Sequence, residues 1–482
     1  MTYDSGHHFP HAAWIFVTTA TFLFFYNMLR ATGNLSALLW ALAIIQLSPL
    51  ILDLILGRTS LLSCMLIIHF FYTCFAKIYL LMRPVSLLEN APAIRHGLEE
   101  QIISTAIILA SYLALSLLFP SRRENQKNKL VQLEVSLNAC FFLIVYFLMI
   151  PWRGYWCPSS LTAINNYLCS LVIIAVLTVT PKGYDRIYRI LVPLLGIYLW
   201  VDYLLSVMMT YIALFLFAYI LLALINKKLS IIPYCIVGLG LFSFMQIIKG
   251  PLRNSLWHEE NSERSFSDRI ELVMAAAEES LFESGGPSDE MSELPDADLA
   301  EETLSRINED ILGRVIELSP DVVPFLSGRS YEQLLYLAIP RFLWAGKPSV
   351  FSANEFGRLY QFISEFDFGT SISMPILAEG YANFGYSGLY SVAALLGCIV
   401  FLAQRVCQLP LEGNYQFSFL ALFTVFIRYE NPLSTVIYTF TGVMIALYAL
   451  KFWGTMAGFL SHPIETGGKF TLGTRARSPS VS

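Results

Sequence analysis

The sequence predicts an all-α integral membrane protein with about twelve transmembrane helices and one large polar loop. Of its 482 residues, 56% are hydrophobic and 14% are charged, whereas soluble domains are typically about 45–50% apolar and about 25% charged. Apolar runs of membrane-spanning length recur along the chain, and lysine and arginine gather in particular short loops. Together these observations place the chain in the membrane class before any motif is considered.

The predicted spans follow from length, because a helix needs roughly 20 mainly apolar residues to cross about 30 Å of hydrocarbon. About nine spans lie in 1–249 and about three in 374–453, before a polar tail at 454–482. The runs at 187–201 and 415–428 are short and could be half-helices or tilted helices. In chain order the predicted spans are 12–29, 35–56, 60–82, 101–119, 131–151, 161–179, 187–201, 203–225, 231–249, 387–406, 415–428 and 432–453.

The orientation of the spans follows from lysine and arginine, which are enriched in cytoplasmic loops. They concentrate in the loops 120–130, 180–189 and 226–230 and in the C-terminal tail. With twelve spans, all four segments fall on the same side of the membrane, which must be the cytoplasm. Both termini are then cytoplasmic, and the long segment 250–373 lies on the opposite side.

The segment 250–373 is the main polar feature of the chain. It holds 23 acidic and 9 basic residues, a net charge of −14. Within it, 259–317 has apolar residues at helical spacing and predicts amphipathic helices, whereas 320–373 is richer in proline, glycine and aromatics and predicts a compact loop layer. The eight cysteines are scattered and form no CxxC pair. We interpret them as small buried hydrophobes rather than as a disulfide framework or metal ligands.

A group of cationic side chains lies on the non-cytoplasmic side of the predicted spans. Positive charge is normally depleted there, and arginine offers a planar fork that matches phosphate oxygens. We therefore expect anion binding, with a lipid-linked diphosphate as the natural ligand. The alternative is that these cations pair with loop carboxylates or extend toward lipid headgroups. The residues are Arg253, Arg341, Lys347 and Arg428.

A second candidate group lies in the segment 378–388, directly before the span at 387–406. Glu379 and Asn383 are four residues apart and would share one helix face. A carboxylate beside membrane-embedded backbone is a candidate general base, and the glycines would let backbone approach a ligand or a neighbouring helix closely. The alternative is a helix N-terminus with an acidic first turn, which favours the helix dipole without any chemistry.

Several catalytic signatures are missing from the sequence. It has no Walker or GxGxxG sequence after a strand, no GxSxG elbow and no zinc-ligand spacing. The energy for any reaction must then come from an activated substrate or an ion gradient. We expect no cofactor, no metal and no nucleic-acid partner.

Two strings in the second half resemble Wzy-type oligosaccharide repeat-unit (O-antigen) polymerases. Residues 339–348, IPRFLWAGKP, resemble the "PRxLWxxKP" loop of these proteins, and residues 379–388, EGYANFGYSG, resemble their "ExYxNFGxxG" segment before a late span. The preceding residues 324–331, PFLSGRSY, also look like the family's loop. The resemblance covers roughly 240–400.

The resemblance implies a fold like the helical GT-C membrane glycosyltransferases, in the bacterial inner membrane, with 250–373 in the periplasm. The substrate would be an undecaprenyl-diphosphate-linked oligosaccharide embedded among membrane lipids. The growing glycan would move from its carrier onto a new lipid-linked unit, without a nucleotide sugar or ATP.

The resemblance also implies roles for individual residues. Arg341 and Glu379 are the predicted catalytic residues, Arg341 on the diphosphate and Glu379 as the base or as a carboxylate that orients an arginine. Lys347 would also bind the diphosphate, with Arg253 and Arg428 as helpers. The predicted glycan contacts are Tyr381, Asn383 and Trp344.

Other functions stay open on the sequence alone. An O-antigen ligase-like transferase would use the same donor, although ligases typically need a loop histidine and His258 is the single histidine of 250–373. A flippase or transporter predicts inverted repeats and a polar site at mid-membrane, neither of which is evident. A scaffold protein predicts that Arg341 and Glu379 are dispensable. The acidic insert 278–310 departs from the family pattern and could gate the site or bind a chain-length regulator.

Overall fold

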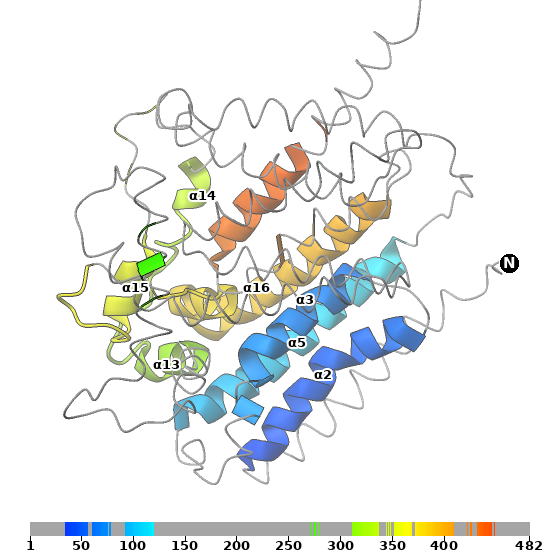
Figure 1. The fold of residues 1–482 in the computed structure, drawn as a ribbon, viewed down its shortest axis with the longest axis horizontal. Helices are drawn as coiled ribbons and strands as arrows, with labels where there is room; N and C mark the ends of the chain where they lie inside the picture. Colours follow the sequence, from blue (N-terminus) through cyan, green and yellow to red (C-terminus); the bar gives the residue numbers. More distant parts are fainter. Residues whose placement is uncertain are drawn as a thin grey trace, which may run out of the picture.

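The computed structural model describes a bundle of helices with short helices packed at one end (Figure 1). All regular elements in the described residues are helical. Those residues are 34–55, 60–75, 77–78, 92–119, 311–336, 351–368, 372–408 and 431–445, with single positions at 271, 274, 275, 278, 344, 346, 348, 422, 425, 426 and 448.

Among the described residues, three helices are long and apolar enough to cross a membrane: α2 (Leu35–Ile55), α5 (Pro92–Leu118) and α16 (Ile376–Gln408). Two shorter apolar helices, Leu61–Cys74 and Leu433–Ile445, accompany them. These elements indicate a multi-pass membrane protein. The spans predicted at 12–29, at 131–249 and at most of 415–428 lie outside the described residues.

The first of the shorter helices is α3 (Leu61–Phe70), which continues into a π-helical turn, η1 (Phe71–Phe75). The Ser60 side chain caps α3 by accepting a hydrogen bond from the Ser63 amide at 3.2 Å. Both serine hydroxyls donate to the Asp53 carboxylate at the end of α2, at 2.5 Å each. The two serines therefore cap the start of α3 and also supply hydrogen bonds to the buried Asp53 carboxylate.

The helix α16 runs beside α5, with α3 and α2 on the same layer (Figure 1). The contact between α16 and α5 is close, because a Cβ at Gly397 would lie 2.5 Å from the Ile108 carbonyl oxygen. One turn on, the rings of Tyr112 and Phe401 meet edge to face at 6.0 Å. The missing side chain at Gly397 thus allows the two backbones to approach.

Polar contacts at the two ends of this layer fix the directions of the helices. Near one end, the Tyr390 hydroxyl donates to Glu100 Oε2 at 2.8 Å. Near the other, the Leu61 amide donates to Gln404 Oε1 at 2.8 Å. The helix α5 therefore runs parallel to α16, whereas α3 runs antiparallel to it. These directions agree with the alternation that the sequence predicts for the corresponding spans.

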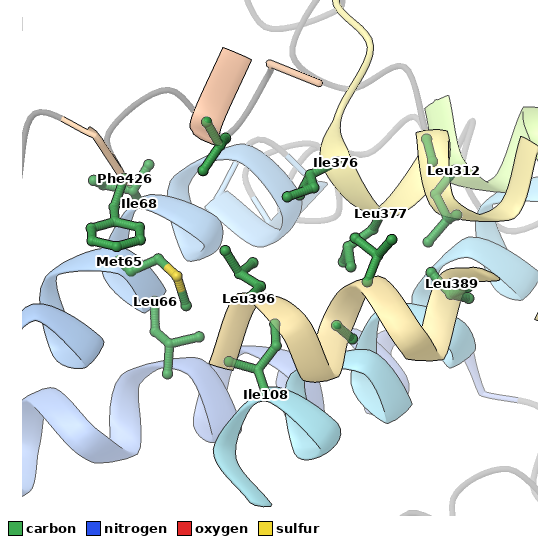
Figure 2. Packing of buried hydrophobic residues seen from close by; sticks show 14 of the residues in the cluster. Met65, Leu66, Ile68, Ile108, Leu312, Ile376, Leu377, Leu389, Leu396 and Phe426 are labelled. Atoms are coloured by element: carbon green, nitrogen blue, oxygen red, sulfur yellow. The ribbon is translucent and has the colours of Figure 1, made fainter. Parts of the chain in front are cut away.

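Buried apolar side chains fill the space between the helices (Figure 2). Ile108 of α5, Leu389 and Leu396 of α16, and Leu312 of α13 (Ile311–Leu318) belong to one buried cluster. The core thus continues from the membrane helices into the polar loop. Cys64, Cys74 and Cys398 form no disulfide. Cys64 and Cys74 are buried, as predicted for small hydrophobes, whereas Cys398 is only partly buried.

The outward faces of the same helices carry exposed apolar side chains. Since lipid tails replace water around a span, such faces are expected to be apolar in a membrane protein. Examples at more than two-fifths exposure are Trp40, Ile44, Ile51, Leu117, Leu395 and Leu402.

The helix α16 consists of two arms, 376–383 and 386–408, joined at Phe384 and Gly385. Gly385 has φ 64° and ψ −146°, a conformation that residues with a Cβ rarely adopt. The arms fold together so tightly that a Cβ at Gly388 would lie 2.1 Å from the Gly380 carbonyl oxygen. The glycines of this segment therefore serve a close approach between helices.

Two boundaries differ from the sequence prediction. The sequence predicts a span only from 101, but α5 begins at Pro92, a residue suited to the first helical position. Its polar residues Glu99 and Glu100 are buried, and Glu100 accepts a hydrogen bond from Tyr390 of α16. The span expected from 387 is preceded by the additional arm 376–383.

The described part of the polar loop contains short helices. They are α13, α14 (Gln333–Tyr336) and α15 (Ala353–Leu359). The first falls at the end of the stretch 259–317, where the sequence predicts amphipathic helices, whereas the other two lie in 320–373, where it predicts a loop layer. Ser352 caps α15 by accepting a hydrogen bond from the Glu355 amide at 3.0 Å. The helix α13 packs against both α5 and α16, which joins this layer to the membrane helices.

We predict that Gly388→Ala lowers the free energy of unfolding by about 1–3 kcal/mol, because the new methyl group meets backbone that cannot move aside. Thermal unfolding of the purified protein in detergent measures this effect. Gly346→Ala is the matched control, since a Cβ there would meet only the Trp344 indole nitrogen at 3.9 Å. Equal melting temperatures for the two variants would contradict the close crossing of the arms.

Candidate functional site

The candidate site lies where the arm 376–383 ends against the loop that follows α13. A helix leaves its last carbonyl oxygens without partners inside the helix. Here the Leu326 amide donates to the Ala382 oxygen at 2.9 Å, and the Ser327 amide donates to the Asn383 oxygen at 3.1 Å. The loop therefore caps the arm. Ser327 and Gly328, at φ 50° and 93°, form the tight turn that allows this approach.

Glu379 is the centre of the hydrogen-bond network. Its side chain is 0% exposed. Oε1 accepts a hydrogen bond from the Ser330 hydroxyl at 2.7 Å, and Oε2 accepts one from the Leu433 amide at 2.6 Å. Both carboxylate oxygens are thus satisfied by charge-assisted bonds.

The bond to Leu433 also caps a second helix. Leu433 begins the apolar helix Leu433–Ile445, whose first amides have no partner within the helix. A carboxylate at this position interacts favourably with the positive end of the helix dipole. Beside it, Gln333 Nε2 of α14 donates to the Ser434 hydroxyl at 2.5 Å, and both residues are buried.

Asn383 completes the network from the next turn of the same arm. Its Oδ1 accepts a hydrogen bond from the Gly328 amide at 3.0 Å. Its Nδ2 donates to the Ser330 hydroxyl and to the Glu379 carbonyl oxygen, at 2.8 Å each. Like Glu379, Asn383 is 0% exposed. The predicted sharing of one helix face by Glu379 and Asn383 is thus confirmed.

Aromatic rings surround the loop and the kink. Tyr331 lies against Phe384, with ring centroids 6.2 Å apart. Burial raises the pKa of the Tyr331 phenol above its usual range, and the nearby Glu379 carboxylate adds to the shift. The phenol therefore stays neutral at physiological pH. Phe384 remains about half exposed at the apex of the kink.

The other sequence-predicted residues fall into three groups. Tyr381 is 4% exposed and packs edge to face against Phe325 and Tyr386, so the structure places it in the core. Trp344 is 41% exposed and packs on Tyr336. The four predicted cations lie outside the described residues: Arg253, Arg341, Lys347 and Arg428.

Other residues of the site were not predicted individually. Ser330 and Arg329 belong to the string 324–331, whose resemblance to the family's loop singles out no individual residue. No motif or spacing in the sequence marks Gln333 or Leu433. Arg329 is the exposed cation of this loop, and it pairs with Glu355 of α15. The contact lies beside Ser330, so a positive charge sits next to the network.

This arrangement limits what the Glu379 carboxylate can do. A general base must reach the proton that it removes. Glu379 has no exposed surface and both of its oxygens accept hydrogen bonds. Its geometry suits an anchor that joins three segments: the loop 326–333, the arm 376–383 and the helix start at Leu433.

Comparison of the chain with protein families, curated proteins and solved structures finds no match.

We predict that Glu379→Ala lowers the free energy of unfolding by about 1–3 kcal/mol, because Ser330 and Leu433 lose their acceptor in a buried site. Glu379→Gln should cost less, since its amide oxygen still accepts one hydrogen bond. Thermal unfolding in detergent measures both variants. Glu332→Gln, at an exposed position of the same loop, is the control and should leave the melting temperature unchanged.

A double-mutant cycle tests the pairing itself. The double variant of Glu379→Ala and Ser330→Ala should cost about 1 kcal/mol less than the two single changes added together, because they remove one shared bond. Strict additivity would mean that the two side chains do not interact.

Proposed function

We propose that the chain is a glycosyltransferase that polymerises lipid-linked oligosaccharide repeat units at the non-cytoplasmic face of the membrane. The resemblance of 339–348 and 379–388 to the polymerase motifs suggests this activity. The observation that carries the proposal is the hydrogen-bonded junction of the two resembling segments 324–331 and 379–388, through Ser330, Glu379 and Asn383. Motif segments that are far apart in sequence thus contribute to one place in the fold.

The position of this junction suits a lipid-linked substrate. The junction lies where α16 and the helix Leu433–Ile445 both begin. Of these two helices, α16 is long and apolar enough to cross a membrane. A lipid carrier keeps its diphosphate at the surface of the hydrocarbon region. A loop fixed at the ends of membrane helices can therefore meet the diphosphate and the glycan together.

In the proposed reaction, the bond between the reducing-end carbon of the growing glycan and its diphosphate oxygen breaks. A hydroxyl oxygen of the incoming unit forms the new glycosidic bond, and its proton passes to the departing diphosphate. The activated donor supplies the energy. Arg341 and Lys347, with Arg253 and Arg428, stabilise the negative charge that develops on the leaving group.

Glu379 and Asn383 act in this proposal by positioning. Their side chains hold the loop 326–331 from its buried side, so that the outward side of the loop faces the substrate. Trp344, which is partly exposed, is proposed to contact the glycan. Tyr381 supports the arm from the core.

We predict that wild-type protein restores long polymer in cells that lack it, whereas Arg341→Ala leaves single lipid-linked units. Glu379→Ala shortens the polymer, and Glu379→Gln retains more of it because one bond of the network survives. Gel analysis of the glycan at matched membrane levels of each variant measures this. The control variants, Arg314→Ala and Glu332→Gln, alter a partly exposed and an exposed side chain outside the hydrogen-bond network and should polymerise normally.

Three outcomes would contradict the proposal. Normal polymer with Arg341→Ala would remove that residue from the site. Polymer that forms but does not reach its final acceptor would point to a ligase. Units that fail to cross the membrane would point to a transporter.

A further inference from the structure

Arg329 projects from the loop 326–331 at the point where that loop is held most firmly. Its neighbours on both sides are bonded to α16: the Gly328 amide to Asn383 Oδ1 and the Ser330 hydroxyl to Glu379 Oε1. The backbone amide of Arg329 also donates to the Leu326 oxygen at 3.0 Å. The side chain itself is 59% exposed. A fixed backbone thus presents a cation to the outside.

The partner of this cation is Glu355, from the first turn of α15. Nη2 of Arg329 lies 2.5 Å from Glu355 Oε1, and the guanidinium carbon lies 5.5 Å from the centre of the Phe351 ring. Among the described residues, the ion pair uses a single guanidinium nitrogen. The Glu355 side chain is 33% exposed. Ion pairs of this exposure are weak, typically about 0.2–1 kcal/mol.

The chemistry of the pair favours exchange with a stronger anion. A guanidinium has five N–H donors in a planar fork, which can bind phosphate oxygens in bidentate fashion. A diphosphate carries more negative charge than one carboxylate, and the ring of Phe351 can support the guanidinium in either state. The surrounding segment 250–373 has a net charge of −14, so an anion that binds there must be held by its basic residues, of which Arg329 is one.

We propose that Arg329 binds the diphosphate of a lipid-linked substrate, and that the Glu355 carboxylate occupies the anion's place until the substrate displaces it. This inference rests on the proposed function and assigns it a cation that the sequence motifs did not single out. Glu355 is then a positioning residue that competes with the ligand. Its removal should strengthen binding, whereas the loss of a purely structural ion pair would not.

Binding of farnesyl diphosphate to the purified full chain in neutral phosphatidylcholine nanodiscs tests the proposal. We expect Arg329→Ala to raise the Kd about tenfold or more, because a charge-assisted bond is lost. Arg329→Lys should lie between, since it keeps the charge but loses the fork. Glu355→Gln should lower the Kd about threefold, because the competing charge is removed. The matched pair on α13, Arg314→Ala and Glu317→Gln, should leave the Kd unchanged.

An unchanged Kd for Arg329→Ala would overturn the proposal, as would a Glu355→Gln variant that loses affinity in parallel with Arg329→Ala. Thermal unfolding of each variant shows whether it folds. If Arg329→Ala does not fold, the Kd of Arg329→Lys decides the question instead. Weaker binding of inorganic pyrophosphate than of farnesyl diphosphate supports a lipid-linked ligand, and equal binding would overturn that part in favour of a free anion.

Polymer length in cells separates this inference from the proposed function. If Arg329→Ala abolishes polymer while its Kd is unchanged, the anion site is wrong and the polymerase proposal stands. If Arg329 and Glu355 affect the Kd as expected but wild-type protein makes no polymer, the anion site stands and the polymerase proposal is wrong.

Discussion

The carboxylate of Glu379 joins three parts of the chain that are far apart in sequence, and the geometry of the candidate site depends on it. Ser330 is 49 residues away and Leu433 is 54 residues away, yet each donates one hydrogen bond to a different oxygen of this side chain. A buried carboxylate is costly unless such partners satisfy it. The site therefore forms only when the loop, the arm 376–383 and the last apolar helix are all in place.

The kink at Phe384 and Gly385 makes this junction possible. It ends the arm 376–383 and exposes carbonyl oxygens that the loop 326–327 can cap. It also turns the second arm back along α5, where Gly397 meets Ile108. The glycines of the segment 379–388 thus shape the backbone, while Glu379 and Asn383 hold the loop. Arg329 projects from the same loop, and its exposed guanidinium pairs with Glu355 of α15.

Some of these features can be predicted from the sequence, whereas others depend on contacts that form only in the folded chain. The helices α2 and the second arm of α16 could be predicted because lipid-facing helices need long apolar runs. The first turns of α5 could not, since Glu99 and Glu100 are polar and their burial depends on how α5 packs in the tertiary fold. In the site, the spacing of Glu379 and Asn383 predicts one shared face. No spacing rule links them to Ser330 or Leu433, because those contacts depend on the tertiary fold.

The most direct test of this account is a cross-link between Gln333→Cys and Ser434→Cys, in a background without the eight native cysteines. These side chains are bonded at 2.5 Å across 101 residues of sequence. A short, reducible bifunctional thiol reagent should join the two fragments made by a protease site introduced within 409–414. The account predicts that the fragments stay together until a reductant is added. Fragments that separate although each cysteine reacts singly would contradict it.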